Sequence, residues 1–303
     1  MTGMTLDRLQ IFLTVAEQMH FTRAAEVLHM SQSSISSAIQ NLEKYYGLKL
    51  FDRIGRHIEI TEAGKFLQIE ARQILEQVDL TERGLQELNN LERGELNLGA
   101  SLTIGNYWLP HKISAFKRQH PGIQVYCTLG NTEEICMGTL NRQFDLGFVE
   151  GEVNPSQTDA LQLDEIGGDR LVIVVGESHP WFHVKEIPLA ELTKTDWVMR
   201  ELGSGTRTTF EQAVKQWGIN PDDLNVVLEM SSGEMVKAVV ESGVGATAIS
   251  ELMVKKELEL ESLRPVKIEE FKTPAQVARV FLQLRHRSRF QTLISQAFAK
   301  TLT

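Results

Sequence analysis

The amino-terminal fold is decided by one stretch, FTRAAEVLHMSQSSISSAIQNLE, at residues 21–43. Thr22 opens a compact predicted helix that reaches Leu28, and its two adjacent alanines permit another helix to approach closely. After a short turn, Ser31 is a suitable N-cap for a second helix that reaches Leu42. Residues at helical spacing form the predicted buried face of this second helix: Ile35, Ala38, Ile39 and Leu42. Two short helices joined by a tight turn have the order of a helix-turn-helix.

The outward face of the second helix carries small polar side chains, where a solvated helix normally carries Glu and Lys. Residues 31–41 contain five serines, two glutamines and one asparagine. Small side chains let a helix lie close in the major groove of DNA, where Gln and Asn can pair with adenine and Ser can reach phosphates. A structural three-helix bundle with a polar face is the alternative, and the pattern favours DNA binding.

The flanking segments complete this small domain. An earlier helix is predicted by apolar residues that form one face: Leu6, Leu9, Ile11, Phe12 and Val15. Gly47 ends the segment that follows, and residues 50–60 predict a small hairpin with alternating polarity and Gly55 at its tip. A hairpin in this position is a wing.

A long helix without a breaker is predicted from about Glu62 to Glu92. Apolar residues recur along it in steps of four and three, with Thr81 as the one polar member: Leu67, Ala71, Ile74, Val78, Thr81, Leu85 and Leu88. This heptad spacing favours a helix–helix partner over a helix that only covers its own core, so we expect a dimer.

From Gly94 onward, strands alternate with helices, which is typical of an α/β domain with mainly parallel sheets. These 210 residues form either one large domain or two lobes with a cleft between them. Apolar runs predict the strands 96–100, 123–129, 144–149, 171–175, 197–199, 226–230, 246–249 and 277–284. Helices are expected between several of them, including 110–120 and 208–217.

The composition excludes several classes of protein. A length of 303 residues with 42% hydrophobic residues suits about two globular domains. No apolar run approaches the ~18 residues of a membrane span, and Met1–Leu13 lacks the features of a secretory signal. Cys127 and Cys136 cannot form a disulfide framework, so a reducing cytoplasm is the expected location. The net charge of −9 lies wholly on residues 66–303, because residues 1–65 hold seven basic and seven acidic side chains.

The chain resembles the LysR-type transcriptional regulators along essentially its whole length. The resemblance is carried by residues 21–36 (FTRAAEVLHMSQSSIS), Leu42–Glu43, residues 47–53 (GLKLFDR) and residues 61–64 (TEAG). It implies a winged helix-turn-helix at 1–61, a dimerising linker helix at 62–93 and an effector-binding domain at 94–303. That domain is similar to type 2 periplasmic binding proteins, with lobe 1 at about 94–165 and 268–303 and lobe 2 at about 166–267.

The resemblance also implies partners and DNA-binding residues. The partners are double-stranded promoter DNA, a small-molecule effector and further copies of the chain, as a homodimer and commonly a homotetramer, with no membrane. The implied DNA-binding residues are Gln32, Ser33, Ser34, Ser36 and Ser37 in the groove, Arg53 and Arg56 in the wing, and Arg23. Ser37, Gln40 and Asn41 stand where the family often has basic residues. We therefore expect a shallow salt dependence, with Lys49 sharing the phosphate contacts.

Polar residues at the starts of helices predict an effector site in the α/β region. Each group follows a strand, where hydroxyls and free amides can bind an anion, although ordinary capping would explain any one group. The family's effector-pocket positions match them: Ser101, Leu102, Thr103, Asn131, Thr132, Gly203, Ser204, Thr206 and Arg207. Arg207 or Arg200 could supply a cation. The sequence therefore predicts a small anionic or polar effector.

Loops at 99–110 and 203–207 resemble those of regulators of sulfur-assimilation or carbon-fixation operons. Sulfite, sulfate or a phosphorylated metabolite would fit the predicted site. We expect no catalysis and no metal or other cofactor, since the sequence holds no nucleophile elbow, phosphate loop or metal-ligand spacing. The alternatives are a redox-sensing regulator that uses Cys127 and Cys136, or a cytoplasmic solute-binding α/β protein.

Overall fold

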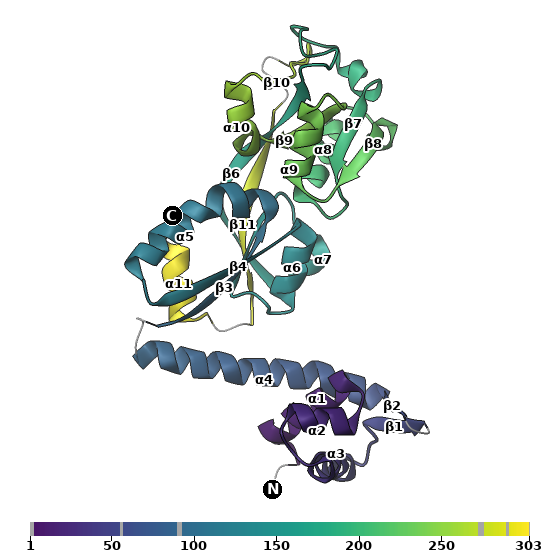
Figure 1. Cartoon of the computed structure of the whole chain (residues 1–303), viewed down its shortest axis with the longest axis vertical. Helices are drawn as coiled ribbons and strands as arrows, with labels where there is room; N and C mark the ends of the chain where they lie inside the picture. The colour runs from purple at the N-terminus through teal and green to yellow at the C-terminus, as the bar shows by residue number, and fades with distance from the viewer. Residues whose placement is uncertain (1–2, 55–56, 90–92, 272–275, 289–290, 303) are drawn as a thin grey trace. The chain divides into compact units, whose positions relative to one another are not determined.

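The computed structural model describes residues 3–54, 57–89, 93–271, 276–288 and 291–302, and its chain divides into two compact units (Figure 1). The first unit covers residues 1–86 and the second covers residues 87–303. Each unit has its own hydrophobic clusters and is treated separately below.

The first unit, here called the head, is a winged helix-turn-helix, as predicted. Its elements are α1 (Leu6–Gln18), α2 (Phe21–Val27), α3 (Gln32–Tyr46), β1 (Phe51–Ile54), β2 (His57–Ile60) and α4 (Glu62–Asn89). The antiparallel pair β1–β2 forms the wing. One cluster joins the three short helices and the wing, and its centre is formed by the fully buried Phe12, Val15, Ile35 and Leu42.

The structure corrects two local predictions in the head and confirms a third. Leu6 is 44% exposed and lies outside the apolar face of α1. The helix α2 begins at Phe21 and not at Thr22, and the His20 ring caps it by accepting hydrogen bonds from the Thr22 and Arg23 amides. The prediction that Ser31 caps α3 is confirmed, because its hydroxyl accepts from the Ser34 amide at 3.1 Å, and the helix extends past the predicted Leu42 to Tyr46.

The heptad seam on α4 is not one continuous stripe for a partner. Leu67 and Ala71 are buried in the core of the head. Farther along the helix, Ile74 is exposed and Leu85 is 62% exposed. The prediction is therefore wrong for its first two positions, because this small domain needs α4 to close its own core. The side chain of Leu88 lies outside the described residues.

The second unit contains one mixed nine-stranded sheet with helices around it. Its strands are β3 (Gly94–Ser101), β4 (Ile123–Gly130), β5 (Leu146–Glu150), β6 (Leu161–Gly176), β7 (Asp196–Arg200), β8 (Asn225–Met230), β9 (Ala246–Ser250), β10 (Leu263–Pro265) and β11 (Gln276–His286). The order across the sheet is β4-β3-β5-β11-β6-β9-β7-β8, and β10 pairs with β6.

The helices of the second unit connect these strands. They are η1 (Ile104–Trp108), α5 (Leu109–Gln119), α6 (Thr132–Leu140), α7 (Pro155–Thr158), η2 (Leu189–Thr193), α8 (Gly205–Gln216), η3 (Pro221–Asp223), α9 (Gly233–Glu241), α10 (Glu251–Glu259) and α11 (Leu293–Lys300). The segment η1 is a π-helix, a form that is frequent at functional sites.

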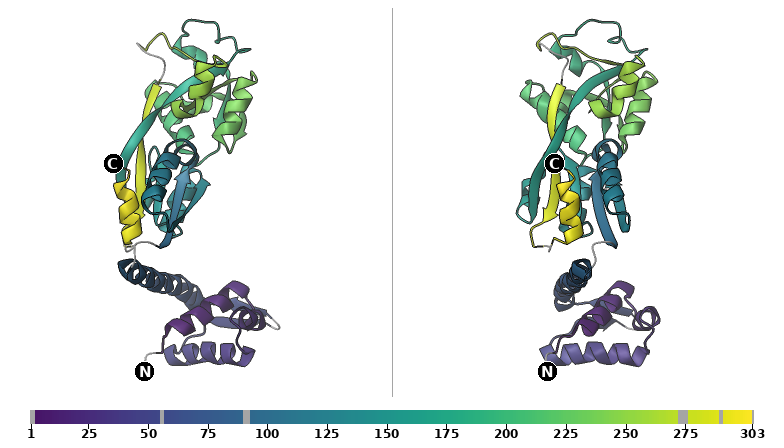
Figure 2. Two further views of the ribbon diagram at one scale, coloured as in Figure 1. Left: turned by 60° about the vertical axis from the view of Figure 1, so that its left-hand side comes forward. Right: turned by 90° about the vertical axis from the view of Figure 1, so that its left-hand side faces the viewer.

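The long antiparallel pair β6–β11 runs through both halves of the sheet (Figure 2). We call the half around β3, β4 and β5 lobe 1, and the half around β7, β8 and β9 lobe 2. Parallel pairing is present within each lobe, at β3–β4, β3–β5, β7–β8 and β7–β9. The expectation of mainly parallel pairing is wrong in the middle of the sheet, where β6 and β11 also pair antiparallel with β9 and β5.

Each lobe is built around its own aromatic core. In lobe 1, Phe116, Phe148 and Phe298 pack together with Phe281 of β11. In lobe 2, Trp197 lies against Phe210, and the Trp197 indole donates to the Leu192 carbonyl at 2.7 Å. These cores hold rigid the ends of the strands from which the candidate site is built.

We expect Glu43→Ala to destabilise the head by about 2 kcal/mol, since it removes a buried carboxylate that holds the wing to α3. Glu43 accepts from the Leu50 amide at 2.9 Å and from Lys49 Nζ at 2.8 Å. The measurement is the free energy of unfolding of the full chain in urea, followed by far-ultraviolet circular dichroism. Glu59→Ala, on the exposed face of β2, is the control; equal losses in the two variants would contradict the assignment.

Candidate functional site

The exposed face of α3 carries the residues predicted to bind DNA. Gln32, Ser33, Ser34 and Ser37 are exposed and Ser36 is half-buried, while Ile35 and Ile39 on the opposite face are buried. At the start of the helix the Ser31 hydroxyl lies 2.9 Å from the Ser33 hydroxyl and 2.7 Å from the Ser34 hydroxyl. The start of α3 therefore presents hydroxyl groups at the positive end of a helix dipole, which favours phosphate.

The basic residues of the head have different surroundings. Arg23 is exposed on α2. Lys49 forms an ion pair with Glu43. This pairing offsets the positive charge that we expected Lys49 to bring to a phosphate. The backbone of Arg53 lies in β1 opposite Ile58, but its side chain lies outside the described residues, as does the whole of Arg56.

The predicted effector residues gather where the strands of the two lobes end. Ser101 ends β3, Asn131 and Thr132 follow β4, and Gly203 to Thr206 follow β7. The carboxyl ends of parallel strands are the usual ligand position in open α/β sheets. Asn131 is the cap of α6, and α8 begins at Gly205, three residues before the predicted start at 208. Likewise, the π-helix η1 precedes α5, which begins at Leu109.

The starts of α6 and α8 join the two lobes directly. The Gly205 amide donates to the Thr132 hydroxyl at 3.1 Å, and the Glu133 amide donates to the Gly203 carbonyl at 3.1 Å. A Cβ atom on Gly205 would lie 2.3 Å from the Glu150 carbonyl oxygen. Only glycine therefore lets α8 approach the end of β5 this closely.

Ser204 is a buried hydroxyl without a partner at the start of α8. It stands at the N-cap position but makes no capping hydrogen bond, and the residue is 1% exposed. Its Oγ has no hydrogen-bond partner in the part of the chain that the structure describes. Since buried polar groups are normally hydrogen-bonded, this hydroxyl beside free helix amides indicates a ligand position.

The cation that contacts Thr206 in this group is Arg279 of β11, which sequence reasoning missed. Its side chain is buried and donates to Thr206 Oγ1 at 2.9 Å and, through Nη2, to Asp169 Oδ2 at 2.8 Å. Its Nη1 lies 3.5 Å from Glu150 Oε1. An arginine inside the apolar run 277–284 was the available signal, because an unpaired charge is not stable in a buried strand.

Two hydroxyls complete this buried cluster. Ser101 Oγ donates to Glu150 Oε2, and Ser250 Oγ donates to Asp169 Oδ2 at 2.5 Å. Burial raises the pKa of the Glu150 carboxyl, whereas Arg279 acts in the opposite direction. Ser101 and Thr206 are therefore part of one buried network of hydroxyls and ion pairs.

The predicted cation Arg207 does not join this cluster. Its guanidinium binds Glu211 at 2.7 Å and Glu229 at 2.5 Å, and it also donates to the Arg200 carbonyl at 3.0 Å. Arg200 itself is buried and makes two hydrogen bonds of 2.8 Å to Glu201. Both predicted cations are thus held by carboxylates of lobe 2.

A second contact between the lobes begins at Thr103, next to Leu102. Leu102 is half-buried, and the buried Thr103 hydroxyl lies 3.7 Å from the Met253 sulfur of α10. In η1, the Tyr107 hydroxyl donates to Glu234 of α9. Desolvation and this carboxylate raise the pKa of Tyr107 to about 12, so it remains a donor at neutral pH.

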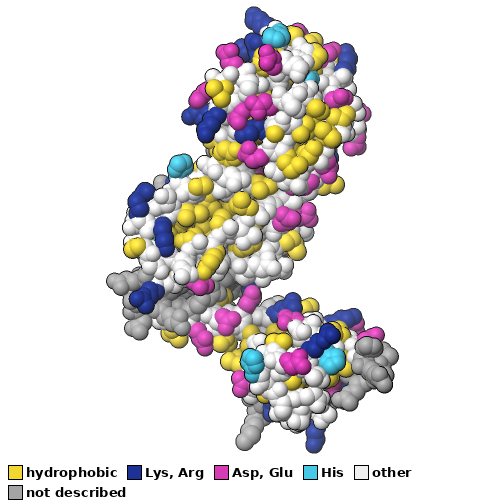
Figure 3. Space-filling model, in the orientation of Figure 1, with side chains coloured by type: hydrophobic (Ala, Val, Ile, Leu, Met, Phe, Trp, Pro, Cys, Tyr) yellow, Lys and Arg dark blue, Asp and Glu magenta, His cyan; other side chains and the backbone are white. Residues whose placement is uncertain are grey.

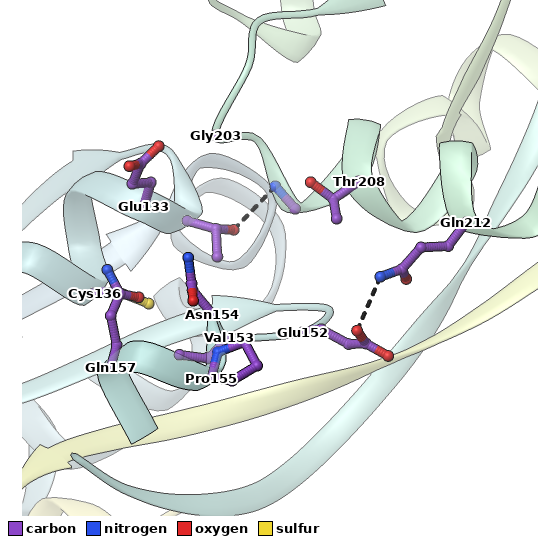
Figure 4. A pocket seen from close by; sticks show the side chains of 12 residues that line it. Glu133, Cys136, Glu152, Val153, Asn154, Pro155, Gln157, Gly203, Thr208 and Gln212 are labelled. Atoms are coloured by element: carbon purple, nitrogen blue, oxygen red, sulfur yellow. Dashed lines mark hydrogen bonds between the residues drawn. The ribbon is translucent and has the colours of Figure 1, made fainter. Parts of the chain in front are cut away.

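A cavity of 370 Å³ opens beside the junction of α6 and α8 (Figure 4). Thr132 and Gly205 border it, Glu133 and Cys136 line the side of α6, and Gln212 of α8 donates to Glu152 at 2.9 Å. A small molecule bound here would reach the helix starts from outside.

The cysteines have the properties of structural thiols. Cys136 is buried in lobe 1, and burial raises its pKa to about 12. Cys127 on β4 is exposed, and its pKa is also raised by partial burial. Neither is the low-pKa thiolate of a reactive site.

Neither a metal-binding cluster nor a membrane-spanning helix is found among the described residues. Among the described residues, no group of three or more His, Cys, Asp or Glu side chains is arranged to hold a metal ion. In the same ranges, no helix combines the length and apolarity that crossing a membrane requires.

An apolar groove of 570 Å³ lies between α5 and β4, the outermost strand of lobe 1 (Figure 3). Pro110, Ile113 and Leu129 line it, with Lys117 and Arg118 beside them. Leu129 is exposed, so this surface resembles an interface more than a solvated edge.

Family models match both units of the chain. Residues 6–65 match the model described as bacterial regulatory helix-turn-helix protein, lysR family. Residues 89–302 match the LysR substrate binding domain.

Curated relatives match nearly the whole chain. A protein described as a probable RuBisCO transcriptional regulator from Cyanidium caldarium is 33% identical over 97% of this chain and 92% of its own length. The protein of the same description from Synechocystis is 32% identical over 98% of this chain and 85% of its own length.

Solved structures show the same fold. Full-length CbnR complexed with its target DNA superposes with a TM-score of 0.67 at 22% identity, over 99% of both chains. The CcmR regulatory domain of Synechocystis in complex with 2-PG superposes with a TM-score of 0.60 at 25% identity, over 69% of this chain and 96% of that domain.

Replacing Arg279 should strongly destabilise the second unit, because Asp169 and Glu150 would be left as buried unpaired carboxylates. We expect Arg279→Ala to lower the free energy of unfolding by about 3–5 kcal/mol near neutral pH. Loss of the cation raises the folded-state pKa of the Glu150 carboxyl further above the unfolded value, so the deficit should grow as pH rises and shrink in acid.

The measurement is urea unfolding of Arg279→Ala at about pH 5 and about pH 8, compared with the natural protein at the same two pH values. Lys267→Ala, at an exposed position of the same unit, is the control and should change stability little. A deficit that is small or independent of pH would contradict the buried ion cluster.

Proposed function

Since the chain belongs to the LysR family of DNA-binding transcriptional regulators, we propose that its two units divide regulation between promoter DNA and a small anionic effector. The head binds the promoter, and the second unit binds the effector. The observation that carries the effector assignment is the unpartnered, buried hydroxyl of Ser204 at the start of α8. No catalytic step is part of this proposal, and the protein acts in the cytoplasm.

The head reads DNA through α3. Gln32, Ser33, Ser34, Ser36 and Ser37 face the major groove, Arg53 and Arg56 contact the backbone from the wing, and Arg23 contacts it from α2. The exposed hydroxyl and amide groups of α3, opposite its buried Ile35 and Ile39, support this assignment. The DNA complex of CbnR, which has the same fold, is consistent with it.

Changing the groove-facing residues should reduce sequence-specific binding. Because a good amide–base pair contributes about 1–3 kcal/mol of discrimination, Gln32→Ala should weaken binding to the adjacent intergenic DNA by roughly tenfold or more. Competition gel shifts against unrelated DNA measure this preference. Gln73→Ala, at an exposed position of α4, is the control. Equal loss on both DNAs, or none, would show that Gln32 reads no base.

The effector lies at the starts of α6 and α8. The Ser204 hydroxyl and the free amides of α8 bind an oxyanion, with Ser101, Thr103, Asn131, Thr132 and Thr206 around them; Leu102 and Gly203 shape the site. Arg279 takes the role of the cation that Arg207 was expected to supply, because Arg279 donates to Thr206 of the site whereas Arg207 is directed to Glu211 and Glu229.

Sulfite, sulfate or a phosphorylated metabolite suits this chemistry. The domain of CcmR in complex with 2-PG supports a small anion, although a similar domain, that of QuiR, is in complex with shikimate. The buried thiol of Cys136 makes a redox-sensing regulator the weaker alternative.

Ser204→Ala tests the effector site without disturbing the fold. Since Oγ has no partner to lose, stability should not fall, whereas the affinity for 2-PG or sulfate should fall about tenfold, the cost of one charge-assisted hydrogen bond. Calorimetry measures the affinity. Ser262→Ala is a matched control, because Ser262 Oγ is also buried without a partner but lies at the start of β10. Equal effects of the two substitutions would exclude Ser204 from the site.

The signal passes through the lobes. An effector that binds one arrangement of the lobes better than another shifts their equilibrium, and the paired heads on DNA change their angle in response. The contacts Gly205–Thr132 and Tyr107–Glu234 join the lobes and are the ones that such a change would break.

The protein works as a homo-oligomer, either a dimer or a tetramer. Apolar side chains left exposed on α4, among them Phe66 and Leu85, support self-association, and so does the groove between α5 and β4. Two copies of the head can then contact the two halves of a promoter site.

A further inference from the structure

The buried cluster beneath the start of α8 contains more carboxylates than cations. Arg279 contributes one guanidinium, while Asp169 and Glu150 contribute two carboxyls. Asp169 accepts two hydrogen bonds from the guanidinium, at 2.5 and 2.8 Å. Glu150 is left beside the remaining nitrogen at 3.5 Å. With both carboxyls ionised, the cluster has a net negative charge at the place where the proposed function needs an anion.

Glu150 already makes the contacts that an anion would make. Its carboxylate accepts a hydrogen bond from Ser101 of β3 and pairs with Arg279 of β11. It is 2% exposed, so water does not screen these contacts. The Glu150 side chain therefore already binds Ser101 and Arg279, two of the residues that should bind the effector.

The other charged groups facing Glu150 come from β6 and β7. Asp169 of β6 adds a negative charge, and Arg200 of β7 adds a positive one. Arg200 is itself held by Glu201 at 2.8 Å. The neighbours from α6 and α8 are neutral: Thr132 donates to the Glu150 backbone carbonyl at 3.4 Å, and Thr206 accepts from Arg279. No surplus cation faces Glu150 among these described neighbours.

We propose that Glu150 is a built-in competitor for the effector anion and that the anion binds together with one proton, which the Glu150 carboxyl takes up. This inference rests on the proposed effector site. In the free protein the carboxylate accepts from Ser101 and pairs with Arg279. When the anion arrives, one proton from solvent neutralises Glu150, and Ser101 and Arg279 turn to the anion.

Proton uptake follows from the balance of charge in the cluster. Two buried negative charges already share one guanidinium, so a third could enter only if one were neutralised. Burial raises the pKa of Glu150, which favours its protonated form, and an added anion would raise this pKa further. The protonated carboxyl can then donate a hydrogen bond, so the site selects an anion with an acceptor oxygen facing β5.

Sulfate is a suitable probe, because it remains a dianion across the pH range of the experiment. Calorimetric titration of the full chain at about pH 6 and about pH 8 should show the affinity falling as pH rises, by up to about tenfold per pH unit once Glu150 is ionised in the free protein. In two buffers of different ionisation enthalpy, the binding heat at the higher pH should report the uptake of about one proton per sulfate.

Glu150→Gln imitates the protonated residue, since its amide keeps the size and can donate. This variant should bind sulfate about tenfold more tightly than the natural protein at the higher pH, and its affinity should not depend on pH. Glu152→Gln, which removes a carboxylate from the neighbouring cavity and not from the cluster, is the matched control and should keep the natural pH dependence.

The outcomes separate this inference from the function it rests on. If the natural protein binds sulfate through Ser204 but takes up no proton, and Glu150→Gln binds no better, the role of Glu150 is wrong and the effector site stands. If Ser204→Ala leaves sulfate binding unchanged in both backgrounds, the effector site itself is wrong. Failure of both the natural protein and Glu150→Gln to bind sulfate would also overturn the proposal, because removal of the buried charge should admit the anion.

Discussion

The guanidinium of Arg279 lies buried among groups from β5, β6 and α8, and the candidate effector site depends on it. It holds Asp169 of β6 and Thr206 of α8 through hydrogen bonds and lies beside Glu150 of β5. A charge buried this completely is tolerated only where its partners are fixed. Because β6 and β11 run through both lobes, this ion cluster lies on the strands that connect them.

Around this cluster, the backbone is arranged so that helix starts converge. Gly205 brings α8 against the end of β5, and Thr132 of α6 receives its amide, while Ser204 is buried beside them without a partner. The head has a separate organisation, in which α3 leaves its hydroxyl and amide groups exposed. The two units thus present different chemistry, one suited to a nucleic acid and one to a small anion.

Much of this could be predicted from local sequence. The helix-turn-helix, the wing and most strands follow from apolar spacing and caps, and Gly47 ends α3 in a left-handed conformation, as expected of a helix end. The early part of β6 was missed because it is polar and only partly buried, so it lacks an apolar run. Arg279 was missed because its role depends on partners more than seventy residues away, and Arg207 was misjudged because Glu229 reaches it only through the fold.

We propose that one ligand site in the second unit governs DNA binding by the head. The direct measurement is the affinity of the full-length protein for promoter DNA, by fluorescence anisotropy, with and without saturating 2-PG or sulfate. We predict a change of roughly five- to a hundredfold, with DNA changing the affinity for the anion by the same factor. Anion binding at the Ser204 site that leaves the DNA affinity unchanged would contradict the account.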